Sequence, residues 1–336
     1  MINSVAVLEF HEVSKTYHSR RGDVCALNGM SFRLEAGAIH VLLGPNGAGK
    51  TTSLEMAVGL RRPDSGNVRT LGLDPLVDGE ELHRWVSLQP QEVTVFEYLR
   101  VGEILDMWAS LYDNPHPRED ILTSLDLADL TDRQITKLSG GQKQRLNVAL
   151  AMVSKPELLI LDEPSTGLDP RARETLWDTL KTWRDQGTTI VLSTHSMEEA
   201  HALADTVMII DHGTCIDHGT PAVILKRHAG TPTITFRTVR PMPAEIRGKL
   251  TDVGTLSIDG YGTGLLRTPN TDRALALLSA SGVAVSIRVT HPTLADAYKE
   301  ATGTALATTR TVFCNVHLPV SCVETLILLS DNLANL

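Results

Sequence analysis

The sequence has no long hydrophobic run. Its most apolar segments, such as Leu158–Leu161 and Val207–Ile210, have only the length of a β-strand, whereas a helix that crosses a bilayer needs about 20 apolar residues. The first residues, MINSVAVLEFHEV, also lack the basic and apolar stretches of a secretory signal. We therefore expect the protein to act at a membrane only through a partner that supplies the spanning segments.

An excess of basic residues and a regular set of cysteines are also missing. With 31 Lys and Arg against 40 Asp and Glu, the net charge is −9, so we expect no general basic surface and no nucleic acid partner. The four cysteines are scattered, which favours a reduced cytosolic compartment over a disulfide framework. Cys314, His317 and Cys322 could form a metal cluster, but accidental proximity in a tail is the favoured interpretation.

The chain is long enough for one large domain and one smaller one, with 336 residues of which 42% are hydrophobic. Over residues 1–227, strands and helices alternate, which predicts an α/β core with a largely parallel sheet. The expected strands are Val5–Phe10, Ser31–Leu34, Ala38–Leu43, Leu158–Leu161, Thr189–Leu192 and Val207–Ile210. The expected helices are Lys50–Val58, one within Leu99–Tyr112 that belongs to a helical insert at about 92–147, one that opens at Asp169-Pro170 and one from Pro221.

After Lys226 the pattern changes to that of a small α+β module over 228–303. The expected strands are Thr233–Arg237, two within Gly254–Arg267, and Ala284–Val289, and the expected helices are Ala244–Leu250, Asp272–Ser279 and Leu294–Ala301. The last helix has an apolar stripe, which we expect to pack against its own module. Residues 304–336 form a tail of uncertain structure to which no function is assigned.

A glycine-rich turn follows the expected strand Ala38–Leu43 and precedes the expected helix Lys50–Val58. This turn matches the phosphate-binding pattern GxxxxGK[ST] in the strand–turn–helix setting that the pattern requires. Its glycines let backbone N–H groups face phosphate oxygens, Lys50 supplies a positive charge to the terminal phosphates, and the Thr51 hydroxyl can ligate Mg²⁺. The predicted nucleotide-binding residues are Gly44, Pro45, Asn46, Gly47, Ala48, Gly49, Lys50, Thr51 and Thr52.

Two acidic residues end the apolar strand at Leu158–Leu161. Asp162 and Glu163 therefore lie at the carboxyl edge of the expected sheet, where ligands of open α/β sheets bind. We predict that Asp162 holds the Mg²⁺ shell and that Glu163 orients or deprotonates an attacking water molecule. Alone this motif is weak, because many buried strands end in an acid, but beside a phosphate-binding turn it predicts nucleotide hydrolysis.

A third motif, Leu138-Ser-Gly-Gly-Gln142, precedes a basic helix. A Ser-Gly-Gly turn at a helix N-terminus is a second phosphate-binding shape, in which Ser139 also serves as the N-cap. Here the sequence resembles the ABC ATPases, whose signature is LSGGQ, over about Val5 to Arg227. The fold that this resemblance implies is the ABC cassette, a P-loop NTPase with a RecA-like core and antiparallel β and helical subdomains.

The resemblance implies roles for further residues. Asp169 lies where the family has its D-loop, His195 matches the switch histidine, Gln91 the Q-loop glutamine that also reaches the metal, and Tyr17 the aromatic residue that stacks on adenine. Each has a plainer alternative. His195 could cap the following helix, Gln89 could be the true match for Gln91, and a tyrosine that ends a strand is often just packed.

The resemblance also implies partners. In this family two cassettes face head to tail, so that Ser139 and Gly141 of one chain close over ATP held by Lys50 of the other. The second cassette is another copy or a paralogue, and an integral-membrane permease is gripped near Gln91. These partners imply a peripheral place on the cytoplasmic face of the cell membrane, and ATP and Mg²⁺ are the implied ligands.

Three segments resemble the ATP-binding subunits of daunorubicin-type bacterial exporters, namely Gly167–Arg173, Ser193–Asp205 and His291–Tyr298. This resemblance predicts a motor that hydrolyses ATP to drive export. The alternatives are an importer motor, which shares the same chemistry, and a soluble ABC ATPase. A chromosome-type soluble ATPase is disfavoured because no sustained heptads appear, and a two-cassette translation factor because the chain has one phosphate-binding turn.

Overall fold

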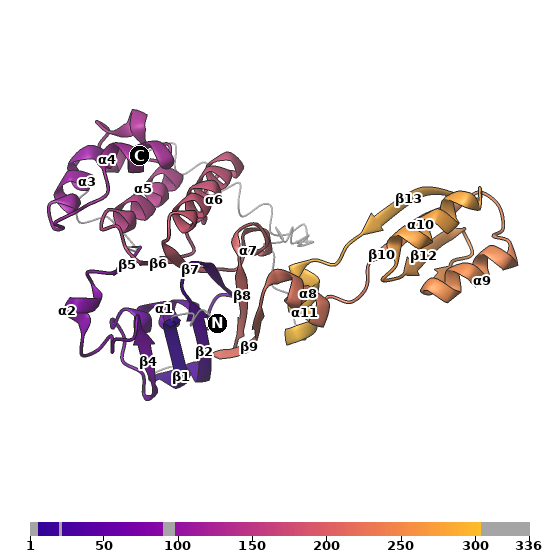
Figure 1. Ribbon diagram of the computed structural model, residues 1–336, viewed down its shortest axis with the longest axis horizontal. Coiled ribbons are helices and arrows are strands. Elements are labelled where there is room, and N and C mark those ends of the chain that lie inside the picture. The colour runs from indigo at the N-terminus through magenta and orange to yellow at the C-terminus, as the bar shows by residue number, and fades with distance from the viewer. Residues whose placement is uncertain (1–5, 20–21, 90–97, 304–336) are drawn as a thin grey trace, which may run out of the picture. The chain divides into compact units, whose positions relative to one another are not determined.

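The computed structural model describes residues 6–19, 22–89 and 98–303, and a six-stranded sheet forms its centre (Figure 1). In sheet order the strands are β5 (Val86–Leu88), β6 (Leu158–Asp162), β7 (Thr189–Thr194), β3 (Ile39–Leu43), β8 (Thr206–Asp211) and β9 (Thr214–Gly219). All neighbours pair in parallel except β8 and β9. Every residue of β3 is buried, as expected for a parallel strand covered on both faces. The predicted α/β core with a largely parallel sheet is confirmed.

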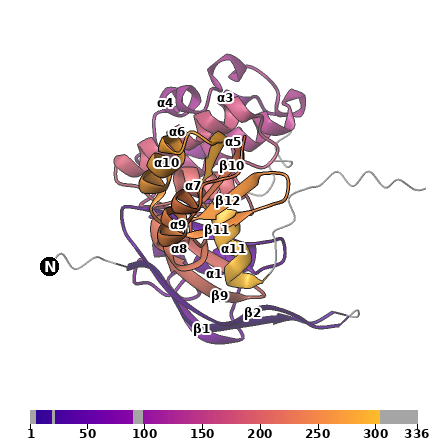
Figure 2. The ribbon, with the colours of Figure 1, turned by 90° about the vertical axis from the view of Figure 1, so that its right-hand side faces the viewer.

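A second sheet is antiparallel and has the strand order β2-β1-β4. Its strands are β1 (Ala6–Tyr17), β2 (Val24–Glu35) and β4 (Ser65–Thr70). Figure 2 shows β1 and β2 as a long two-stranded ribbon. They extend well beyond the predicted strands Val5–Phe10 and Ser31–Leu34, because pairing continues through irregularities in register as far as Tyr17 and Val24. This extension brings Tyr17 to the end of β1.

Helices connect the strands and form a separate group between β5 and β6. In the described part of the first 228 residues, the α-helices are α1 (Lys50–Ala57), α2 (Gly79–Leu82), α3 (Val101–Ala109), α4 (Arg118–Ser124), α5 (Gly140–Met152), α6 (Pro170–Asp185), α7 (Met197–Leu203) and α8 (Pro221–His228). Figure 1 shows α3, α4 and α5 together, at the place of the predicted helical insert. The Asp169 side chain caps α6 by accepting the Ala172 N–H at 3.0 Å, with Pro170 as the first helical residue. Among the described residues, none of the helices is both long and apolar enough to span a membrane.

The segment after α8 contains a third sheet, with the strand order β11-β12-β10-β13 and all neighbours antiparallel. Its elements are β10 (Thr233–Thr238), α9 (Ala244–Val253), β11 (Thr255–Ile258), β12 (Thr263–Arg267), α10 (Thr271–Ala280) and β13 (Ala284–Thr290). They enclose an apolar cluster of their own, which includes the buried Phe236. Gly264 pairs with Phe236, and a Cβ at this glycine would lie 2.2 Å from the ring, so a larger residue would force the buried ring to move. We call residues 231–290 the C-terminal module.

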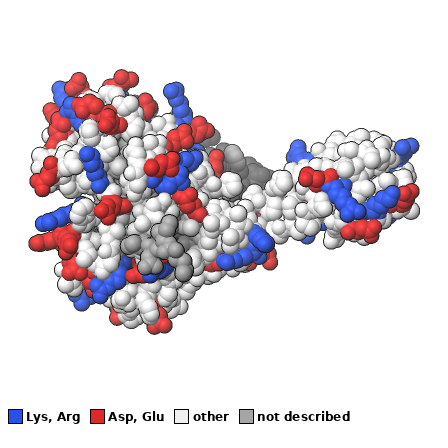
Figure 3. Space-filling view, viewed as in Figure 1, with Lys and Arg blue, Asp and Glu red and all other residues white. Residues whose placement is uncertain are grey.

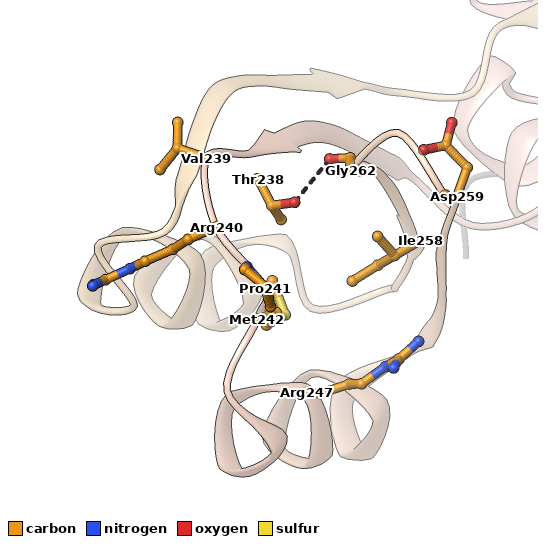
Figure 4. Close-up of a pocket in the computed structure, with 10 residues that line it drawn as sticks. Thr238, Val239, Arg240, Pro241, Met242, Arg247, Ile258, Asp259 and Gly262 are labelled. Atoms are coloured by element: carbon orange, nitrogen blue, oxygen red, sulfur yellow. Dashed lines mark hydrogen bonds between the residues drawn. The ribbon is translucent and has the colours of Figure 1, made fainter.

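The C-terminal module has a hollow of about 460 Å³ between the end of β10, the start of α9 and the β11–β12 turn (Figure 4). Met242 and Ile258 lie beside it, whereas Arg240 points away from it (Figure 4). The Thr238 hydroxyl donates to the Gly262 carbonyl at 3.1 Å and ties the two loops together. On the face shown in Figure 3, basic and acidic residues are mixed over the module as over the preceding domain.

The last described helix, α11 (Leu294–Thr302), does not pack where the sequence indicated. Its stripe of Leu294, Ala297 and Tyr298 is buried in the apolar cluster of the central sheet and helices, and α11 contacts α8, α7 and β9. The expectation that this stripe packs against its own module is therefore wrong. The physical reason is that α8 and α7 offer a large apolar surface, whereas α9 and α10 already cover the small module's sheet.

Candidate active site

The glycine-rich turn lies between β3 and α1, as predicted. Gly49 has a left-handed φ of 104°, and a Cβ there would lie 2.4 Å from the Ala26 carbonyl oxygen. A larger residue is therefore excluded both by backbone conformation and by space. The turn directs the chain into α1, whose first backbone N–H groups have no partner within the helix and suit an anion.

Lys50 is the first residue of α1, and its side chain is only 5% exposed. Its ammonium donates to the carbonyl oxygens of Gly44 at 2.8 Å and Pro45 at 3.1 Å, and lies 3.4 Å from the Glu163 carboxylate. Burial lowers the pKa of Lys50, and the charge of Glu163 opposes that shift. The turn thus holds one buried positive charge at its centre.

Thr51 and Asp162 converge across the edge of the sheet. The Thr51 hydroxyl donates to one Asp162 oxygen at 2.8 Å, and the Ser193 hydroxyl donates to the other. A hydroxyl and a carboxylate of this kind are the hard oxygen ligands that Mg²⁺ prefers, so the pair fits such an ion. Ser193 is a contact that sequence reasoning missed, although its strand partner in the register of β6 and β7 is Asp162.

Glu163 and His195 meet in the structure as a pair. The Nδ1 atom of His195 lies 3.1 Å from a Glu163 carboxylate oxygen, and Glu163 has a φ of 48°, a left-handed conformation that is rare outside glycine. Burial raises the pKa of Glu163, but the bond and charge of His195 and the charge of Lys50 together leave it below its usual value. The carboxylate is therefore held in its charged form beside the Lys50 ammonium and the His195 ring.

The alternative role of His195 as a helix cap does not hold. Ser196 caps α7 by accepting the Glu199 N–H at 3.3 Å, which leaves the imidazole for Glu163.

Tyr17 lies beside the end of the phosphate-binding turn. Its hydroxyl is 3.5 Å from the Thr52 hydroxyl, and the side chain is half-buried. The predicted Gln91 lies outside the described residues. Its neighbour Gln89 is buried, and the backbone N–H of Gln89 donates to the Ile160 carbonyl at 2.8 Å. Stacking of Tyr17 on adenine and the choice between the two glutamines stay predictions.

The Ser139 turn caps α5 with a reciprocal pair of bonds to Gln142, of 2.9 and 3.2 Å. Within the described part of the chain, the side chains of Ser139 and Gln142 make hydrogen bonds only to each other's backbone N–H groups. A Cβ on Gly141 would lie 3.3 Å from the Gly167 carbonyl oxygen, so this turn packs closely on the segment before Asp169. Two residues after Gln142 on α5, the Gln144 side chain donates to the Glu163 carbonyl at 3.1 Å, a contact that the sequence did not predict.

A family model described as ABC transporter matches residues 27–166. The chain is 36% identical over 252 residues to the Nod factor export ATP-binding protein I of Burkholderia orbicola (strain AU 1054), which covers 74% of this chain and 81% of that protein. It is 34% identical over 298 residues to the daunorubicin resistance ATP-binding protein DrrA3 of Streptomyces coeruleorubidus, covering 84% and 93%.

Solved structures show the same fold. The chain is similar to an ATP-binding subunit of an ABC transporter, with a TM-score of 0.59, 27% identity and coverage of 66% of this chain and 92% of that one. It is also similar to the cassette MJ0796 in a dimeric post-hydrolysis state with ADP and Pi, with a TM-score of 0.58, 23% identity and coverage of 63% and 98%. The second likeness bears on the fold alone.

Proposed function

This chain belongs to the ABC transporter family of ATP-binding proteins, and we propose that it is the ATP-hydrolysing motor of an exporter. The relatives named for Nod factor export and daunorubicin resistance support the direction of transport. The observation that carries the proposed chemistry is the meeting of Lys50, Glu163 and His195 at the end of the phosphate-binding turn. The cargo is left unassigned, because cargo contacts belong to the membrane subunit.

The phosphate-binding turn and Lys50 bind the terminal phosphates of ATP. The ammonium exchanges its bonds to the Gly44 and Pro45 carbonyls for phosphate oxygens, which carry a full negative charge. Tyr17 beside Thr52 stacks on the adenine. Thr51 and Asp162, with Gln91, hold Mg²⁺, which neutralises charge on the phosphates when bound.

Glu163 orients the attacking water molecule and accepts its proton in the transition state. His195 bonds to Glu163, which keeps the carboxylate charged and directed at the terminal phosphate. Both residues follow strands of the central sheet, β6 and β7, which pair directly, so their separation is set by the sheet itself.

Hydrolysis requires a second cassette and coupling requires a permease. Ser139, Gly141 and Asp169 of the partner cassette complete the site over ATP, so that ATP joins two chains and hydrolysis releases them. The second cassette is another copy of this chain or a paralogue, and the permease holds the pair on the cytoplasmic face of the membrane.

The chain divides into a cassette and a smaller part, with the boundary near residues 227 and 228. The separate apolar cluster of the C-terminal module supports this division. Within the predicted range 228–303, however, α11 packs with the cassette, so we propose that the module is inserted between α8 and α11.

Replacing Glu163 with glutamine tests the proposed chemistry. We expect Glu163→Gln to bind MgATP with near-wild-type affinity and to hydrolyse it at least about a hundredfold more slowly, because proton transfer by a placed group contributes about 10²–10⁴-fold. ATP-dependent dimers should accumulate, which size-exclusion chromatography would detect. Turnover at the wild-type rate would mean that Glu163 is misassigned.

A further inference from the structure

Glu199 is a buried acid that the chemistry above does not use. It lies on α7, and only 1% of its surface is exposed. A carboxyl group at this depth loses its hydration, and the loss is offset only if each oxygen finds donors. The side chain is therefore expected to sit in a closely defined set of hydrogen bonds.

Three donors meet this carboxyl group, and they come from separate parts of the fold. The Ser165 hydroxyl donates to Oε1 from the loop after β6. The Trp177 indole N–H, on α6, lies 3.3 Å from the same oxygen and 3.1 Å from the Ser165 hydroxyl. The Thr194 side chain, at the end of β7, is a further hydrogen-bonding neighbour of the carboxyl group and lowers its pKa against the effect of burial.

Two of these donors are next to the reacting groups. Ser165 follows Glu163 by two residues, and Thr194 directly precedes His195. The Thr194 carbonyl in turn accepts the N–H of Gly44 at 3.2 Å, where the phosphate-binding turn begins. The carboxyl group of Glu199 thus contacts both the loop that follows Glu163 and the strand end that precedes His195. Through Thr194 it is also linked to the start of the phosphate-binding turn.

We propose that Glu199 is a positioning residue for hydrolysis, which holds the Ser165 loop against the end of β7 so that Glu163 and His195 stay paired. A leucine of similar volume would fill the same space without the desolvation cost, so what the carboxyl group adds is orientation. This proposal rests on the hydrolytic roles of Glu163 and His195.

The test compares four variants of the full chain in MgATP hydrolysis, nucleotide binding and thermal unfolding. Glu199→Leu removes every bond to the carboxyl group. Ser165→Ala removes the hydroxyl that bonds both to Glu199 and to the Trp177 indole, and Glu199→Gln keeps an oxygen that can accept. Thr179→Val is the matched control, because its buried hydroxyl donates to the Ser124 carbonyl at 2.6 Å, away from the site.

We expect Ser165→Ala and Glu199→Leu to lower kcat about tenfold or more, because a displacement of about 1 Å can cost about a hundredfold, while ATP affinity stays within about twofold. Glu199→Gln should recover most of kcat, and Thr179→Val should change unfolding but not kcat. Ser165→Ala with wild-type kcat, or a fall in kcat that follows the melting temperature in every variant, would overturn the proposal. A Glu163→Gln reference separates the two ideas, since wild-type turnover in that variant refutes the hydrolytic assignment itself.

Discussion

At the scale of single residues, the charged groups of the site are placed so that they can bind a polyphosphate. Lys50 is buried and lies between two carbonyl oxygens and the Glu163 carboxylate. His195 bonds to the same Glu163 oxygen, Oε1, that faces the Lys50 ammonium. A phosphate chain carries more negative charge than the carbonyl oxygens do, so we expect it to displace them from the Lys50 ammonium. In the proposed function, Glu163 then keeps its bond to His195 and binds the attacking water molecule.

Glu199 gives a pH dependence of stability at the same scale. Burial raises its pKa above the usual 4.5, so the folded protein binds this proton more tightly than the unfolded chain does. The resulting stabilisation is fully present below pH 4.5 and is lost as pH rises through the folded-state pKa. We expect the free energy of unfolding of the wild type to fall relative to Glu199→Gln as pH rises from about 4.5 towards 7. Urea unfolding at several pH values measures this difference, and a constant or rising difference would contradict it.

The candidate site residues could be predicted where they are neighbours in the sequence. Lys50 and Thr51 stand in one motif, and Asp162 and Glu163 end one strand, so local patterns place them. The structure adds contacts between residues far apart in the chain. Ser193 reaches Asp162 over 31 residues and Ser165 reaches Glu199 over 34. A lone serine or glutamate gives no local signal of such a partner.

At the scale of elements, we expect α11 to stabilise the cassette. Tyr298 is 1% exposed and packs in the cassette's apolar cluster. We expect Tyr298→Ala to lower the free energy of unfolding by about 3–5 kcal/mol, as is typical for a large buried aromatic residue. Denaturant unfolding, followed on the transition that ADP shifts, measures this. Tyr261→Ala is the control, because Tyr261 is 92% exposed on the C-terminal module, and its effect should stay within about 0.5 kcal/mol. Equal effects of the two changes would contradict the packing of α11.

Elements with a strong local period were predictable to within two residues. The predicted strand Leu158–Leu161 became Leu158–Asp162, and Thr189–Leu192 became Thr189–Thr194. β1 was predicted too short because its outer half, up to Tyr17, is mostly polar and is held by pairing with β2. The partner of α11 was mispredicted because an apolar stripe shows that a helix is covered but not by what.

At the scale of the whole molecule, the C-terminal module is expected to serve coupling rather than ATP binding. Thr233 and Thr290 pair in adjacent strands, so the chain enters and leaves the module at neighbouring points. Excising 231–290 with a short linker should therefore keep the cassette fold and basal ATPase activity. We expect it to remove stimulation by the membrane subunit, measured as ATPase activity of the copurified complex.

A truncation before Thr231 serves as the comparison for the excision. The truncation also removes α11, which packs in the cassette's apolar cluster, whereas the excision keeps α11. The truncation should therefore destabilise the cassette, and the excision should not. Full stimulation of the excised form at equal expression would reduce the module to a dispensable part, and loss of its basal activity would place the module within the cassette.

The central claim is that two chains share each site, and a mixing experiment tests it most directly. One subunit carries Lys50→Ala and the other an inactivating change at Ser139, so each homodimer has two damaged sites. A head-to-tail heterodimer combines both defects in one site and leaves the other intact. We predict that mixing restores ATPase activity to about a quarter of the wild-type level at equal amounts of the two subunits, if pairing is random and each site works alone. About half of the dimers are then heterodimers, and each heterodimer has one intact site of two. No recovery at any ratio, with heterodimers shown to form, would contradict the shared site.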